Sequence, residues 1–230
     1  MNNQLIRKLG FWLLWVGFLG YAFFLAPPNQ PDTFTLIKNM SLGNLAGINP
    51  AIVALFYLMG VFPAIYACIL FIDGRGQKIW AWIFILFSFG VGAFAILPYL
   101  ALRENNPKFP GNKDWLIKLQ DSRWYGIFLA IATITLLAFG IIKGDWTDFV
   151  QQWQTSRFIH VMSLDFCLLS LLFPALVGDD IKRRETENNL FLSIVAIAPL
   201  LGAITYLSLR PSLPKNNTQV AEDSQVSLTN

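Results

Sequence analysis

The chain has 230 residues, of which 55% are hydrophobic and 13% are charged, and its formal net charge is +3. A soluble domain ordinarily carries about 45–50% apolar and about 25% charged residues, so this composition excludes a disordered chain and argues against a soluble globular protein. Two cysteines and one histidine are too few soft ligands for a zinc ribbon or a bis-histidine haem, and we expect neither a metal nor a cofactor.

Six apolar stretches are long enough to cross a membrane; they cover residues 9–26, 51–72, 79–102, 124–142, 158–177 and 190–209. Crossing about 30 Å of hydrocarbon takes about 20 residues of helix. The stretches are apolar throughout rather than alternating, which favours helices over the strands of a membrane barrel. The sequence therefore predicts an all-α integral membrane protein with about six transmembrane helices.

The first stretch resembles a signal peptide, because Arg7 and Lys8 precede it. It ends in Phe-Leu-Ala-Pro-Pro over residues 24–28, which is a poor cleavage site, so we expect a retained helix.

Polar links between the spans predict short surface helices. Trp146, Phe149, Val150 and Trp153 lie at positions i, i+3, i+4 and i+7, which is one face of an amphipathic helix lying at the membrane surface. Asp145 is placed to cap its first turn. Shorter helical segments are expected within residues 27–50 and 114–120.

Two segments 107 residues apart share a pattern. Residues 73–103 and 180–210 each begin with an aspartate before a basic loop and end in Tyr-Leu-x-Leu-Arg. The matched pairs that we single out as candidate functional residues are Asp73 and Asp180, Tyr99 and Tyr206, and Arg103 and Arg210. The pattern predicts two repeats of three helices each, although convergent use of apolar residues is the alternative.

An odd number of spans in each repeat would turn the second copy upside down, as in many transporters. The expected organisation is a first half over residues 1–103, a central basic loop over 104–123, a second half over 124–210 and a disordered polar tail over 211–230. In a chain with six spans, the lysines and arginines divide 8 against 9 between the two faces. The positive-inside rule then gives no orientation.

Asp165 is the best candidate for a functional group inside the membrane, because it lies about eight residues into the fifth span. Burying an ionisable group in lipid is expensive, and such groups usually serve a function. Arg157 and His160 share a face of the same predicted helix. A proton or ion site built on Asp165 and His160, which the long side chain of Arg157 could approach, is the functional hypothesis. The alternative is a structural contact of Asp165 with a neighbouring helix or interfacial water, with His160 near the headgroups.

Residues 157–210 also resemble a family of small bacterial and cyanobacterial membrane proteins that is classed as a domain of unknown function. The resemblance rests on Phe158, Asp165, the loop that begins Asp180-Ile-Lys-Arg-Arg, Gly202 and the ending Tyr-Leu-x-Leu-Arg over residues 206–210. It implies a helical membrane fold in a bacterial plasma membrane or a thylakoid membrane, and it implies no particular activity.

Motifs of known enzymes are missing from the sequence: there is no P-loop, dinucleotide fingerprint, HExxH or GxSxG, so we expect no catalytic activity. A basic patch laced with aromatic residues is also missing, and we expect no nucleic-acid partner. We expect a non-catalytic accessory or assembly factor whose partners are the lipid bilayer and a membrane protein or second copy. The alternative is a small secondary transporter with a midplane site near Asp165.

Overall fold

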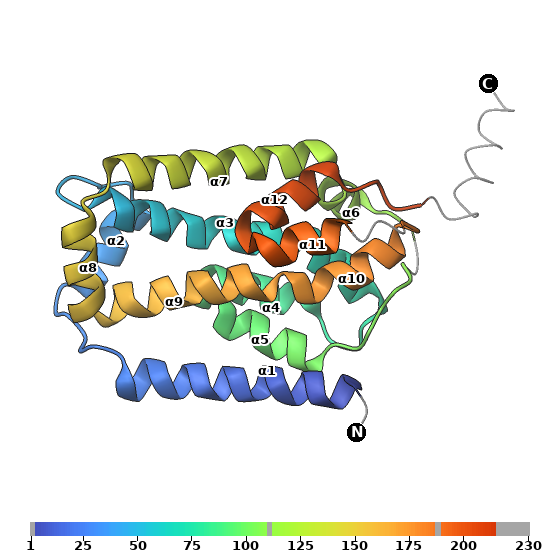
Figure 1. The fold of residues 1–230 in the computed structure, drawn as a ribbon, viewed down its shortest axis with the longest axis horizontal. Coiled ribbons are helices and arrows are strands. Elements are labelled where there is room, and N and C mark those ends of the chain that lie inside the picture. Colours follow the sequence, from blue (N-terminus) through green and yellow to red (C-terminus); the bar gives the residue numbers. More distant parts are fainter. Residues whose placement is uncertain (1–2, 110–111, 187–189, 215–230) are drawn as a thin grey trace, which may run out of the picture.

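Long helices lie side by side along one direction of the molecule (Figure 1). The computed structural model describes residues 3–109, 112–186 and 190–214, which contain helices and no strand. The elements are α1 (Asn3–Gly20), η1 (Tyr21–Leu25), α2 (Thr33–Ser41), α3 (Pro50–Asp73), η2 (Gly74–Gly76), α4 (Ala81–Val91), α5 (Ala93–Leu102), α6 (Trp115–Gln120), α7 (Arg123–Lys143), α8 (Trp146–Thr155), α9 (Arg157–Leu172), α10 (Pro174–Arg183), α11 (Leu190–Ile197) and α12 (Pro199–Leu209).

Four continuous helical segments are long and apolar enough to cross a membrane, namely Gln4–Leu25, Pro50–Gly76, Arg123–Lys143 and Arg157–Arg183. They correspond to α1 with η1, α3 with η2, α7, and α9 with α10. The prediction of an all-helical chain is confirmed for the described residues, and these four segments fit a membrane protein.

The third and sixth predicted spans are not single helices. Residues 79–102 fold as α4 and α5, with a break at Gly92, whose φ of 50° and ψ of −124° suit a residue without a side chain. The side chain of Gln77, before α4, donates a 2.8 Å hydrogen bond to the carbonyl of Glu104, after α5. The chain therefore enters and leaves this hairpin at the same end.

The second hairpin consists of α11 and α12, which are separated at Ala198. A Cβ atom on Gly202 of α12 would lie 2.5 Å from the carbonyl oxygen of Ile194 on α11, so glycine allows the two helices to pack backbone to backbone. In place of six spans, the described part of the chain has four long helices and two hairpins.

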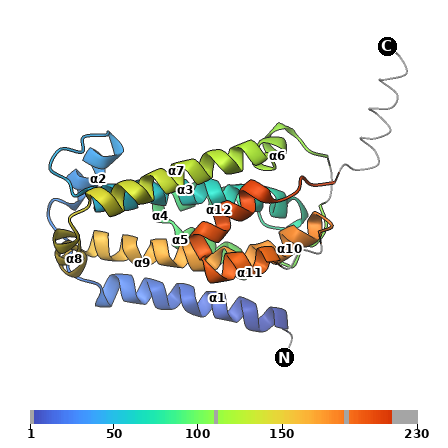
Figure 2. The same cartoon turned by 45° about the horizontal axis from the view of Figure 1, so that its top comes forward.

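Both halves of the chain run in the same direction. The ends of the described chain lie at one end of the bundle, and α2 and α8 lie at the opposite end (Figures 1 and 2). Each half has two long helices, joined by a short helix, and then a hairpin. Two traverses return the chain to the end where it started, so the prediction of an inverted second half is wrong.

The surface helices form where the sequence pattern predicts them. The carboxylate of Asp145 accepts hydrogen bonds from the backbone N–H groups of Thr147 and Asp148 at the start of α8. Asp114 caps α6 in the same way through the N–H of Ile117. Of the predicted disordered tail, residues 215–230 lie outside the described residues.

Helix α3 forms the centre of the core and is the most buried of the long helices. Its Tyr66 is fully buried and donates a 2.6 Å hydrogen bond to the carbonyl of Leu169 on α9. Helix α1 lies at the periphery and contacts α5, where Phe18 stacks on Phe94 and the indole N–H of Trp15 donates to the Phe94 carbonyl.

Candidate functional site

The repeated residues of the first half form a buried cluster around Asp73, which is 0% exposed. Tyr99 donates a 2.5 Å hydrogen bond to Asp73 Oδ2. Arg103 approaches the same carboxylate with two nitrogens, Nε at 2.8 Å from Oδ2 and Nη2 at 2.6 Å from Oδ1. This fork holds the end of hairpin α4–α5 against the end of α3.

The second half repeats the arrangement around Asp180, which is also 0% exposed. Tyr206 donates a 2.7 Å hydrogen bond to Asp180 Oδ2, and Arg210 Nη1 lies 3.0 Å from the same oxygen. Each tyrosine follows its aspartate by 26 residues and each arginine by 30. The sequence matches at an offset of 107 therefore correspond to equivalent contacts.

One arginine joins the two clusters. Arg183 contacts Asp73 Oδ1 through Nη2 and lies 3.4 Å from Asp180 Oδ1 through Nη1. Arg103 also reaches Asp179 at 2.6 Å, and Arg184 reaches Asp121 at 2.6 Å. The network joins four arginines and one lysine to four aspartates; its members are Arg103, Arg183, Arg184, Arg210, Lys113, Asp73, Asp121, Asp179 and Asp180.

Opposite charges in the network offset the cost of burying two of its arginines. Burial lowers the pKa of Arg103, but hydrogen bonds and charge attraction from Asp73 and Asp179 outweigh burial and raise that pKa above the ordinary value. The pKa of Arg184 is likewise raised, because the attraction of Asp180 and Asp121 exceeds the cost of burial. The clusters around Asp73 and Asp180 thus fasten both hairpins to the long helices.

Asp165 lies elsewhere, halfway along α9, and is 5% exposed. Its Oδ1 accepts a 2.7 Å hydrogen bond from the backbone N–H of Ala93, the first residue of α5. A Cβ atom on Gly92 would lie 1.8 Å from Oδ2, so the glycine makes room for the carboxylate. Asp165 therefore caps the helix that begins at the break in the first hairpin.

His160 and Arg157 do not join Asp165, contrary to the sequence expectation of one site. The Nδ1 atom of His160 lies 2.9 Å from the Trp153 carbonyl, which can only accept, so Nδ1 carries the proton. In the neutral ring Nε2 then accepts from the Tyr21 hydroxyl at 2.7 Å. These bonds fasten η1 to the corner between α8 and α9.

Arg157 has a similar anchoring role at the start of α9. Its backbone N–H donates to the carbonyl of Pro28 at 3.1 Å, and its Nε donates to the carbonyl of Pro27 at 2.9 Å. Among the described residues no arginine, lysine or histidine contacts the Asp165 carboxylate. Asp165 is thus a buried acid with one backbone donor and no cationic partner in the part of the chain that is described.

A cavity of about 680 Å³ lies between α1, α3, α9 and the first hairpin, and Asp165 and Arg157 are both on its wall. The remaining lining is mostly apolar and comprises Leu19, Ala22, Phe23, Asn29, Thr33, Phe56, Tyr57, Met59, Gly60, Ser88, Phe89, Gly90, Val91, Gly92, Phe94, Phe158, Val161 and Met162. Its size is in the range of cavities that hold small organic ligands.

The equivalent place in the other half lacks the carboxylate. Leu58, 107 residues before Asp165, lines a smaller apolar cavity of about 280 Å³ between α3, α7, α8 and α9. There α7 packs closely on α3, since a Cβ atom on Gly140 would lie 2.7 Å from Cβ of Ala54. The large cavity lies between α1 and α9, the corresponding pair of helices. The cavity beside Asp165 is therefore larger than the one beside Leu58, and it has a carboxylate where the smaller cavity has an apolar side chain.

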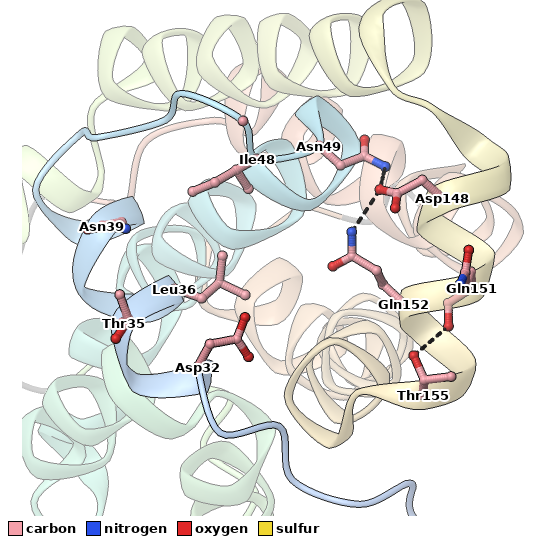
Figure 3. Close-up of a pocket in the computed structure, with 11 residues that line it drawn as sticks. Asp32, Thr35, Leu36, Asn39, Ile48, Asn49, Asp148, Gln151, Gln152 and Thr155 are labelled. Atoms are coloured by element: carbon pink, nitrogen blue, oxygen red, sulfur yellow. Dashed lines mark hydrogen bonds between the residues drawn. The ribbon is translucent and has the colours of Figure 1, made fainter.

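A third, polar cavity of about 500 Å³ lies between α2 and α8 (Figure 3). Asp148 Oδ2 accepts 2.7 Å hydrogen bonds from the side-chain amides of Asn49 and Gln152. Asp32 lines this cavity and the next residue, Thr33, lines the large one. The first turn of α2 thus separates a polar cleft from the apolar cavity, a relationship that no pattern in the sequence indicated.

No protein-family model, no curated protein and no solved structure matches this chain. The resemblance of residues 157–210 to a bacterial membrane family finds no support in these comparisons.

Proposed function

We propose that the protein is a small secondary carrier whose substrate binds in the cavity beside Asp165. The observation that carries this proposal is a buried carboxylate on the wall of a cavity of about 680 Å³, with no cationic side chain against it among the described residues. An unpaired buried charge is costly, so such a group takes up a proton or a cation. A carrier uses that uptake to bind its substrate or a coupling proton.

The break at Gly92 supports a carrier. Non-helical backbone at membrane depth is tolerated only where protein buries it or where it lines a cavity, and broken helices form the binding sites of many transporters. Gly90, Val91 and Gly92 all line the large cavity. The side chain that caps the broken helix, Asp165, is therefore also the group placed to meet the substrate.

We also propose an orientation, with both ends of the described chain on the cytoplasmic side. The end of the bundle with the chain ends carries 13 described lysines and arginines, and the opposite end carries three. The three are Lys38, Lys143 and Arg157; the 13 are Arg7, Lys8, Arg75, Lys78, Arg103, Lys108, Lys113, Lys118, Arg123, Lys182, Arg183, Arg184 and Arg210. The positive-inside rule assigns the richer end to the cytoplasm.

In that orientation the polar cavity between α2 and α8 opens on the outer face, and α9 starts there. Asp165 lies eight residues after Arg157, which is about 12 Å along a helix. That depth is close to the middle of a hydrocarbon layer of about 30 Å. The equivalent contacts of Asp73 and Asp180 further support an internal duplication with both copies in the same orientation.

Uptake by proteoliposomes tests the carrier function. Vesicles containing the protein or its Asp165→Asn variant are incubated with a small-molecule extract of cells, washed and analysed by mass spectrometry. We expect at least one solute that accumulates with the native protein and not with Asp165→Asn. The control is Leu58→Ala, at the equivalent position of the smaller cavity, which should accumulate the same solute as the native protein.

The accessory or assembly role expected from the sequence is the competing proposal, in a bacterial plasma membrane or a thylakoid membrane. It predicts a stoichiometric protein partner that copurifies from native membranes equally with both the native protein and Asp165→Asn. Such a partner, together with vesicle contents that do not differ between the two proteins, would contradict the carrier.

A further inference from the structure

We propose that the substrate of the Asp165 cavity is a lipophilic organic cation, meaning a molecule with aromatic or bulky apolar groups around a delocalised positive charge. The inference rests on the carrier function proposed above and adds the class of molecule carried. It follows from the side chains that line the cavity and from the charged groups among them.

The lining is rich in aromatic and sulfur-containing side chains. Six aromatic residues surround the cavity; they are Phe23, Phe56, Tyr57, Phe89, Phe94 and Phe158. Aromatic faces attract cations, and this attraction is stronger when the site is desolvated. Met59 and Met162 also line the cavity, and their flexible thioethers adapt to ligands of different shape. This lining fits an apolar cation rather than a polar solute.

The charged residues on the cavity wall are Asp165 and Arg157. Arg157 donates its Nε to the carbonyl of Pro27 and does not contact Asp165, so the Asp165 carboxylate is the group available to attract a weakly hydrated cation. Hard cations such as Ca²⁺ take six to eight oxygen ligands, whereas the described lining offers one carboxylate, on Asp165, among mostly apolar side chains. An organic cation with delocalised charge loses little hydration on entering such a cavity. Its charge would then compensate the buried carboxylate.

Protons compete with a cation for the same carboxylate, so binding depends on pH. The surrounding elements carry other titratable or charged groups, which are Arg7 and Lys8 on α1, Tyr21 on η1, Lys38 on α2, Tyr57, Tyr66, Cys68 and Asp73 on α3, and Arg157, His160 and Cys167 on α9; α4 and the start of α5 have none. Of these groups, Tyr57 and Arg157 line the cavity with Asp165. Tyr66 donates to Leu169, and His160 and Tyr21 bind each other. Asp165 is left as the carboxylate that a cation would neutralise.

Tetraphenylphosphonium and tetraphenylborate test this inference, because they have nearly the same size and shape and carry opposite charges. Binding of each radiolabelled ion to the purified full-length protein is measured by equilibrium dialysis at pH 8. We expect saturable binding of tetraphenylphosphonium, weakened at least tenfold in Asp165→Asn, and unchanged in Leu58→Ala. Binding should also weaken as the pH falls, because the protonated carboxyl no longer attracts a cation.

The asparagine in Asp165→Asn keeps an oxygen that can accept from the N–H of Ala93, and unchanged thermal unfolding would show that the hairpin is intact. If Asp165→Asn unfolds, Asp165→Glu serves as a second variant that keeps the charge and should keep binding. The inference is overturned if the protein prefers tetraphenylborate, which would indicate binding at Arg157. It is also overturned if both ions bind equally well. If the cation binds but is not taken up into vesicles, the cation site stands and the carrier function is contradicted. If a solute of another class is taken up in an Asp165-dependent way, the carrier function stands and the cation specificity is contradicted.

Discussion

Asp73 and Asp180, 107 residues apart in the sequence, are bridged by the single guanidinium group of Arg183. Each aspartate also binds its own tyrosine and arginine. The bridge brings equivalent positions of the two halves to the same end of the bundle. It also connects both hairpins to one charge network.

Removing one charge of this network should destabilise the protein strongly. Asp73→Asn leaves Arg103 and Arg183 buried without a full counter-charge, and breaking a buried ion pair costs about 3–5 kcal/mol. We expect a clearly lower unfolding temperature of the purified variant in detergent. Lys78→Gln is the control, because Lys78 is exposed at the same end and surface changes cost within about 0.5 kcal/mol. Equal stability of the two variants would contradict a stabilising network.

The contribution of Arg103 to stability should not depend on pH between 7 and 10. Burial lowers the pKa of Arg103, but the Asp73 and Asp179 carboxylates raise it by more. The pKa of Arg103 therefore lies above its ordinary value. A group with a raised folded-state pKa contributes fully below its unfolded-state pKa, which for arginine lies well above pH 10. The contribution is lost only as the pH rises through the folded-state value. Denaturant titration gives the difference in free energy of unfolding between the native protein and Arg103→Gln. This difference should stay constant between pH 7 and 10, and a decline before pH 10 would contradict the raised pKa of Arg103.

Gly92→Ala should disrupt the break in the first hairpin. The φ of 50° is strained for alanine, and the new methyl group would overlap Asp165 Oδ2. Backbone strain of this kind costs about 1–3 kcal/mol before the overlap is counted. We expect a lower unfolding temperature and weaker binding of tetraphenylphosphonium. In Gly178→Ala, where a methyl group meets open space within α10, stability should be equal to or above that of the native protein.

Cysteine labelling should separate the two topologies. Six spans would place Lys78 and Gln151 on the same face of the membrane, whereas four spans and two hairpins place them on opposite faces. In a background without Cys68 and Cys167, a membrane-impermeant maleimide added to intact cells should label Gln151→Cys. It should label Lys78→Cys only after permeabilisation. Labelling of both in intact cells, or of neither, would contradict the proposed orientation.

The amino-acid sequence by itself determined the helical, membrane-compatible character of the chain, the positions of α8 and α6 and the pairing of the motifs around Asp73 and Asp180. These features follow from local composition, from capping side chains and from residue spacing, all of which can be read along the chain. Hydropathy, however, measures only the length of an apolar stretch. Residues 79–102 are as long as a span, and nothing in their hydropathy distinguishes a single helix from one that reverses at Gly92.

Only the tertiary structure decided the number of long helices, the common direction of the halves and the charge asymmetry between the two ends. The structure also shows that Asp165 does not contact His160 or Arg157. Its carboxylate instead accepts a hydrogen bond from the backbone N–H of Ala93, 72 residues away in the sequence. The cavity also depends on contacts between distant segments. It exists because α1 packs on α5 and leaves space between α1 and α9. Such contacts between distant segments arise from packing in three dimensions, where a side chain's neighbours are set by the whole bundle rather than by its own helix.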